Sequence, residues 1–108
     1  MIARIWRATL PRTRAQDYAR HFTDYVAPSL SPIPGYRGAR VLCNGESDLA
    51  EVVVVTWWSS REAIRRFAGP DIRRAVVAPG VRQMFVSCDD TVSHYEVIAE
   101  DEPRTDLS

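Results

Sequence analysis

Residues 36–67 read YRGARVLCNGESDLAEVVVVTWWSSREAIRRF, and this stretch predicts two strands followed by a helix. Residues 36–43 and 50–58 have the composition of strands, and Asn44-Gly45 between them accepts the positive φ of a hairpin connection. The four consecutive valines in the second strand are typical of a strand covered on both faces. We therefore expect an antiparallel pair whose second strand is buried from two sides.

A helix-start pattern follows the second strand. Ser59 and Glu62 have the spacing of a capping box, and one apolar stripe follows them, formed by Ala63, Ile64 and Phe67. Residues 71–77 are expected to add a helical turn or two before Pro79-Gly80 breaks it. Residues 84–97 are expected to contain the last strand.

The segment before residue 36 predicts a strand and an amphipathic helix. Residues 2–10 mix β-branched and aromatic side chains and stop at Pro11. Residues 13–26 place apolar side chains at three- and four-residue steps, and Pro28 forbids continuation of this helix. The full order is the α+β, ferredoxin-like βαββαβ arrangement, in which two helices cover one face of a four-stranded antiparallel sheet.

The second face of such a sheet also needs a cover. An apolar bare face on so small a domain is best buried against the same face of another copy, so we expect a closed two-fold homodimer. Residues 1–99 form the predicted domain, and the acidic, polar residues 100–108 are expected to be a disordered tail.

Composition excludes several classes of function. The 14 basic residues balance 14 acidic ones and are spread along the 108-residue chain, which excludes nucleic acid as a partner. Every basic residue is Arg, so a Schiff-base lysine is excluded. No apolar run approaches the roughly 20 residues that cross a bilayer. Cys43 and Cys88 lie far apart without metal-ligand spacing, which predicts free thiols in a cytoplasmic protein.

Five stretches of the sequence resemble a known family: MIARIW at 1–6, IPGYRG at 33–38, WSSREAIRRF at 58–67, FAGPDIRRAVV at 67–77 and HYEV at 94–97. Together they resemble the antibiotic biosynthesis monooxygenase family in register to about residue 97. The resemblance implies a dimeric α/β barrel. Members of that family include cofactor-free quinone-forming oxygenases of aromatic polyketide pathways, haem-degrading enzymes and proteins without a defined activity, so the fold alone does not name the reaction.

The resemblance also bears on cofactors. Haem-degrading members typically carry an asparagine, a tryptophan and a histidine at places held here by Trp6, Phe67 and Val77. With no imidazole or thiolate at Val77 to ligate iron, we expect no haem, no other cofactor and no metal. Quinone-forming members carry an aromatic residue near the end of the third strand, which Trp58 matches, whereas Val54 stands where their asparagine is expected.

Base-assisted oxygenation defines the candidate catalytic residues. A substrate carbanion that reacts with O2 needs a base and a group that stabilises the developing oxyanion. His94, which shares a strand face with Glu96, is the candidate base, with a histidine of the dimer interface as the alternative. Arg4 shares parity with Trp6 and is the candidate oxyanion partner. His21 falls on the polar side of the first helix, where it is expected to be solvated unless it lines a pocket mouth.

Aromatic side chains predict a wall for a flat ligand. The expected substrate-binding residues are Trp6, Tyr18, Phe22, Trp58 and Phe67, although core packing is the simpler explanation for Phe22 and Phe67. The leading hypothesis is a cofactor-independent monooxygenase of an aromatic polyketide-type phenol or anthrone, with O2 as co-substrate. Two alternatives use the same pocket: cyclisation or isomerisation of a polyketide intermediate, and binding of a small aromatic molecule by a non-catalytic accessory dimer.

Overall fold

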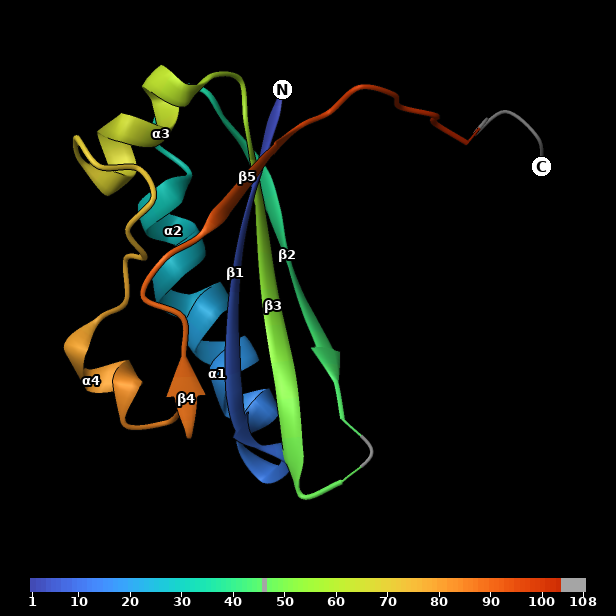
Figure 1. The fold of residues 1–108 in the computed structure, drawn as a ribbon, viewed down its shortest axis with the longest axis vertical. Helices are drawn as coiled ribbons and strands as arrows, with labels where there is room; N and C mark the ends of the chain where they lie inside the picture. The colour runs from blue at the N-terminus through green and yellow to red at the C-terminus, as the bar shows by residue number, and fades with distance from the viewer. Residues whose placement is uncertain (46, 104–108) are drawn as a thin grey trace.

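The strands form one antiparallel sheet, and the helices lie beside it (Figure 1). The computed structural model describes residues 1–45 and 47–103. Three long strands, β1 (Ile2–Pro11), β2 (Tyr36–Asn44) and β3 (Leu49–Trp58), lie in the order β2-β3-β1. The remaining side of β1 pairs with two short strands, β4 (Ser87–Cys88) and β5 (Ser93–Glu96).

The strand order and the antiparallel pairing confirm the ferredoxin-like α+β fold, with one difference in strand number. The expected fourth strand is divided, so the sheet has five strands. The chain leaves the sheet between β4 and β5, where the backbone amide of Val92 bonds to the carbonyl of Arg73 and not to β1. Of the expected tail, residues 100–103 are exposed and irregular, and 104–108 lie outside the described residues.

The first helical segment extends beyond residue 26, where Pro28 was expected to end it. It runs through a 3-10 turn (Arg12–Arg14), α1 (Ala15–His21), a π-helical turn (Phe22–Val26) and α2 (Ala27–Leu30) without leaving helical geometry. The expectation that Pro28 stops the helix is wrong. Pro28 occupies the first turn of α2 after the π-helical turn, a position at which a missing backbone N–H is tolerated.

The second half of the chain also departs from expectation in its short elements. Helix α3 (Arg61–Ala68) is capped by Ser60, whose hydroxyl accepts from the Ala63 amide at 3.2 Å, and not by Ser59. Residues 71–77 form no helix: the Arg74 amide donates to the Asp71 carbonyl at 3.3 Å in a single turn, Arg74 then bridges Thr91, and the residues after it are irregular. The Pro79-Gly80 pair does not break a helix; it begins the short helix α4 (Pro79–Arg82).

The helices lie on one side of the sheet and bury its inner face (Figure 1). The largest fully buried side chains belong to this layer: Leu10, Leu30, Val52, Trp58 and Ile64. The opposite face, which we call the outer face, carries Ile5, Leu42, Val53, Trp57 and Tyr95. Leu42 is 49% and Tyr95 55% exposed, so apolar side chains on the outer face remain uncovered in one chain. No helix among the described residues is long and apolar enough to cross a membrane.

Candidate active site

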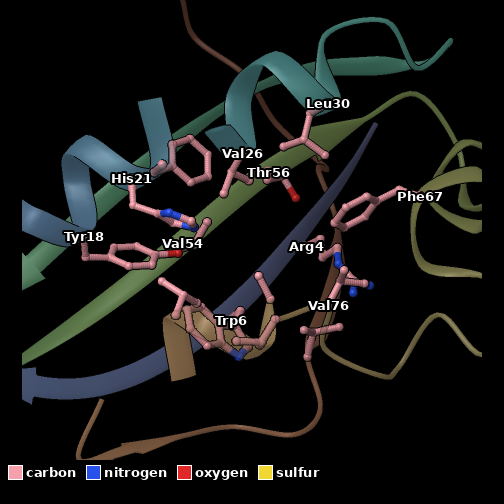
Figure 2. A pocket seen from close by; sticks show the side chains of 15 residues that line it. Arg4, Trp6, Tyr18, His21, Val26, Leu30, Val54, Thr56, Phe67 and Val76 are labelled. Carbon is pink, nitrogen blue, oxygen red and sulfur yellow. The ribbon is translucent and has the colours of Figure 1, made fainter. Parts of the chain in front are cut away.

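A cavity of about 90 Å³ lies between the inner face of the sheet and the first helical segment (Figure 2). Strands β1 and β3 supply one wall, and Tyr18 to Leu30 supply the other at helical spacing. Phe67 from α3 contributes at one side. Residues 69–86, which we call the cover segment, pass over the cavity and contribute Val76, Val77 and Val81. The cavity is therefore closed partly by a stretch with little regular structure.

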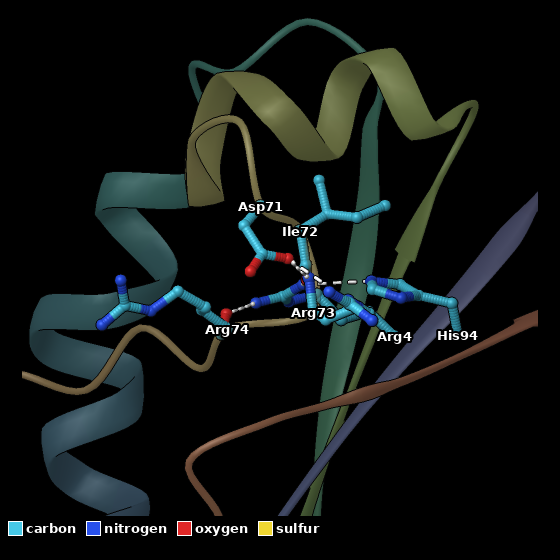
Figure 3. Close-up of polar contacts among 6 residues, drawn as sticks. All are labelled: Arg4, Asp71, Ile72, Arg73, Arg74 and His94. Carbon is cyan, nitrogen blue, oxygen red and sulfur yellow. Dashed lines mark hydrogen bonds and ion pairs between the residues drawn. The ribbon is translucent and has the colours of Figure 1, made fainter.

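Arg4 is the charged group of the cavity wall. It is 5% exposed, and its guanidinium donates to the backbone carbonyls of Ile72 and, at 2.8 Å, Arg74 (Figure 3). The guanidinium carbon also lies 5.7 Å from the centre of the Phe67 ring. Within the described part of the chain no carboxylate forms an ion pair with Arg4. Burial lowers the pKa of Arg4 to about 10, so it remains a cation at neutral pH.

His94 lies beside Arg4, behind the cavity wall. The two residues are direct partners in the β1–β5 ladder, and His94 Nε2 lies 3.0 Å from Arg4 Nη1. Because a guanidinium can only donate, Nε2 must accept, which requires a neutral imidazole. Burial lowers the pKa of His94, and the positive charges of Arg4 and Arg61 lower it further. His94 does not line the cavity, so its place differs from that expected of a base that contacts the substrate.

Thr56 stands next to Arg4 in the β1–β3 ladder and lines the cavity. Its hydroxyl accepts a hydrogen bond of 2.8 Å from Trp58 Nε1. Trp58 itself is fully buried, stacks on Phe67 with ring centres 5.7 Å apart, and does not line the cavity. The indole therefore lies behind Thr56, and the expected contact of Trp58 with a ligand stays a prediction.

Tyr18 and His21 form the polar surface on the helical wall. They are one turn apart on α1, with ring centres separated by 6.1 Å, and both line the cavity (Figure 2). Burial raises the pKa of Tyr18 to about 12, so its phenol stays protonated and can donate a hydrogen bond. We call Tyr18 and His21 the helix end of the cavity, and Arg4 and Thr56 the anion end.

Aromatic side chains line the space between these ends. Trp6, Phe22 and Phe67 lie in the wall together with Tyr18, where the sequence analysis expected a surface for a flat ligand. Trp6 packs edge-on against Phe85 at 5.4 Å, and its Nε1 donates to the carbonyl of Asp89 at 2.8 Å. Whether these side chains bind a substrate stays a prediction; the structure places them on one surface.

Two polar cavity residues were not among the expected site residues. Thr56 was hidden within an apolar strand, although its spacing from Trp58 and its alignment with Arg4 put all three on one face. His21 was assigned to the solvated side of the first helix. His21 follows Tyr18 by three residues within α1, and this i, i+3 spacing places both side chains on the cavity side of the helix.

The structure is a ferredoxin-like α+β domain with a cavity between its sheet and its helices. The family model for antibiotic biosynthesis monooxygenases matches residues 1–79 of the 108. The chain belongs to the antibiotic biosynthesis monooxygenase family, which confirms the resemblance seen in the sequence. A search of curated proteins finds no significant match.

Solved structures of the same fold include proteins with different ligands. A putative antibiotic biosynthesis monooxygenase from Bacillus cereus is 16% identical, with 94% of this chain and 97% of that chain covered and a TM-score of 0.68. MhuD, a haem degrader from Mycobacterium tuberculosis with two haems in its active site, is 21% identical (94% and 100% covered, TM-score 0.64). ActVA-Orf6, a monooxygenase of Streptomyces coelicolor in complex with nanaomycin D, is 14% identical (95% and 92% covered, TM-score 0.63). These structures share the fold of this chain, and its membership of the family supports a monooxygenase-like role.

The expectation that the chain works without any cofactor is wrong, because the fold does not exclude a porphyrin. Proteins of the same fold, MhuD among them, hold porphyrin in their active sites. In this chain, His21 is an imidazole of the cavity wall that has the chemistry of an axial iron ligand. The cavity of about 90 Å³ is smaller than the roughly 300–1,000 Å³ typical of small-molecule sites, so without movement of the cover segment it holds neither a porphyrin nor another ligand of several rings. We therefore derive no step through a porphyrin.

Proposed function

We propose that this protein is a monooxygenase of an acidic, flat aromatic molecule, a phenol or an anthrone of the polyketide type. The observation that carries the proposal is Arg4: a buried cation that faces a cavity with aromatic walls and has no ion-pair partner among the described residues. Buried charges in proteins are ordinarily paired. A deprotonated substrate oxygen would supply the missing negative charge.

Arg4 and His21 divide the chemistry in this proposal. Arg4 stabilises the phenolate or enolate form, which is the electron-rich form that reacts with oxygen. His21, whose ring lies in the cavity wall, takes the proton that the substrate loses. His94 positions Arg4 through the 3.0 Å contact and does not touch the substrate. This replaces the direct role expected of His94 by an indirect one.

A ligand with several rings requires the cover segment to move. Val76 and Val77 line both the cavity and a groove of about 430 Å³ on the other side of them. Displacing these two side chains would join the two spaces into one of the size typical of ligand sites. Val76 is already 53% exposed, so its displacement sacrifices little buried area.

We further propose that the protein is a homodimer joined through its outer face. That face carries Ile5, Leu42, Val53, Trp57 and Tyr95 together with Arg7, Arg40 and Glu51, and exposed apolar side chains grouped in this way mark interaction sites. A two-fold contact would let the same face cover itself. The cavity lies on the inner face, so dimerisation would leave it accessible.

The test of the oxygenase is oxygen uptake with an anthrone as substrate, measured with the purified protein before and after addition of haemin. Uptake that needs folded protein and falls in His21→Gln supports the proposal. Uptake that appears only with haemin would assign the chemistry to a porphyrin instead. Binding of the anthrone with no uptake under either condition would overturn the oxygenase and favour a cyclase, an isomerase or a binding protein.

A further inference from the structure

The Thr56 hydroxyl carries a hydrogen for which the described residues 1–45 and 47–103 show no acceptor. An indole Nε1–H is a donor only, so in the 2.8 Å contact Trp58 donates and the Thr56 oxygen accepts. A hydroxyl that accepts one bond still has its own proton to donate. Among the described residues Thr56 makes no hydrogen bond as a donor. A buried hydroxyl with an unused donor normally finds an acceptor, and here the cavity is the space beside it.

Thr56 and Arg4 occupy paired positions on neighbouring strands. Arg4 and Thr56 are direct partners in the β1–β3 ladder, so their side chains leave the same face of the sheet at adjacent positions. Figure 2 shows the Thr56 oxygen on the side of the cavity where Arg4 and Phe67 lie. The anion end therefore presents two kinds of donor, one of them charged.

Trp58 gives the Thr56 hydroxyl one orientation. The indole is fully buried and held by stacking on Phe67, with an angle of 21° between the ring planes. Its N–H occupies one lone pair of the Thr56 oxygen, which leaves the hydroxyl proton to point elsewhere. A preoriented donor costs less entropy on ligand binding than a freely rotating one.

We propose that Thr56 is a specificity-determining residue: its hydroxyl and Arg4 bind one anionic oxygen of the ligand together, and Trp58 positions that hydroxyl. The inference rests on the proposed function for its location, because it concerns the same cavity. It adds that the site prefers deprotonated phenols and enols to neutral molecules of the same shape. The preference depends on a neutral hydroxyl and an indole as well as on charge.

The experiment uses 4-nitrophenol, a single-ring phenol whose yellow phenolate reports ionisation directly. Its pKa in complex with the wild-type protein should lie below its value in water, because the anion end favours the phenolate. Thr56→Val keeps the β-branched shape and removes the donor. It should raise the pKa of the bound dye by about one unit, which is roughly a tenfold loss of affinity for the phenolate. Thr56→Ser, which restores a hydroxyl, should restore most of the shift.

Trp58→Phe tests the positioning role. It removes the Nε1–H and keeps a ring against Phe67, and it should raise the bound pKa of the dye by a smaller amount than Thr56→Val. In the Thr56→Val background the same change should add nothing to the bound pKa, because the hydroxyl that Trp58 orients is gone. A merely structural role of Trp58 would instead give the same effect in both backgrounds.

The control ligand is 4-nitroanisole, which has the same ring and cannot ionise. Its affinity should be equal for wild type and Thr56→Val. Equal losses for both ligands, an unchanged pKa of the bound dye in Thr56→Val, or failure of the wild type to bind the phenolate would each overturn the inference. Oxygen uptake is a separate readout: its absence with the pKa shift intact would remove the proposed oxygenase and leave the anion preference standing.

Discussion

The two polar ends of the cavity differ in how their groups are held. At the anion end, Arg4 is fixed by two backbone carbonyls and His94, and Thr56 is fixed by Trp58. At the helix end, Tyr18 and His21 contact each other and their neighbours only through ring packing, with His21 and Tyr25 centred 5.6 Å apart. Rigid donors suit recognition of a charge, whereas a less restrained imidazole suits proton transfer. We therefore expect binding effects from one end and rate effects from the other.

The largest effect should follow from His21→Gln at the helix end. Loss of the base should lower kcat with the anthrone roughly a thousandfold, within the range that acid–base catalysis supplies. The pKa of bound 4-nitrophenol should stay as in wild type, because the anion end is untouched. Stopped-flow oxygen consumption and dye titration measure the two quantities. If His21→Gln retains the wild-type kcat, His21 is not the base, and the assignment of rate effects to the helix end is wrong.

Arg4→Met should have the next largest effect, and on binding. Removing the cation should raise the pKa of bound 4-nitrophenol by about two units, roughly a hundredfold in phenolate affinity. Arg4→Lys retains a charge and should recover part of this loss, although it cannot donate to both carbonyls in the same geometry. Thermal unfolding of both variants checks that the fold is retained. If Arg4→Met binds 4-nitrophenolate with the wild-type affinity, Arg4 does not bind the anionic oxygen.

Tyr18→Phe should produce a smaller loss and should show what the helix end contributes beyond a base. The phenol has a pKa of about 12, so it donates a neutral hydrogen bond throughout the usual assay range. Removing it should lower kcat/KM roughly fivefold, as expected for one neutral hydrogen bond. The pH profile should not change shape, since Tyr18 does not titrate in that range. If the acidic or the alkaline fall of kcat/KM disappears in Tyr18→Phe, then Tyr18 titrates in the assay range and its role as a neutral hydrogen-bond donor is wrong.

The smallest effect should be a pH dependence of stability that arises at the anion end. The pKa of His94 is lowered in the folded protein from its usual 6.5, by burial and then by Arg4 and Arg61. The unfolded chain therefore binds this proton more readily, so folding is favoured above pH 6.5 and loses this contribution as the pH falls through the lowered pKa. The change should stay under about 1 kcal/mol because the imidazole is partly exposed.

Urea unfolding between pH 5 and pH 8 measures that dependence. His94→Gln keeps an acceptor for Arg4 but cannot take up a proton, so its free energy of unfolding should vary less with pH than that of wild type. His21→Gln is the matched control from the helix end and should retain the wild-type pH dependence. Equal slopes for wild type and His94→Gln would contradict the contact between His94 and Arg4.

Much of the fold followed from local pattern. The strands at 36–43 and 50–58 were placed to within a residue or so, because strand composition is a property of short stretches, although neither Asn44 nor Gly45 has the positive φ expected of a hairpin turn there. The elements that were predicted wrongly lie where contacts outside the local stretch determine the backbone conformation. Residues 71–77 form a single turn and then a bridge from Arg74 to Thr91 in place of a helix, and Pro28 is tolerated because a π-helical turn precedes it.

In the candidate site too, local rules placed some residues, and others could be placed only from the tertiary structure. The parity rule correctly put Arg4 and Trp6 on one strand face, and the helical period put Tyr18 and Phe22 on the wall opposite them. The same period groups His21 with Tyr18, although His21 was expected on the solvated side, and no local rule showed that Thr56 would stand beside Arg4. Strand register decides that neighbour, and register depends on the whole ladder.

The sequence by itself determined the order of elements, the apolar outer face and the family, because these depend on residue type and spacing along the chain. Only the tertiary structure decided that Arg4 is buried without a carboxylate, that His94 faces its guanidinium, and that Trp58 bonds to Thr56. A hydrogen bond or an unpaired charge is a relation between groups in space. In this protein those relations join residues from β1, β3, β5 and the cover segment, which meet only when the sheet has formed.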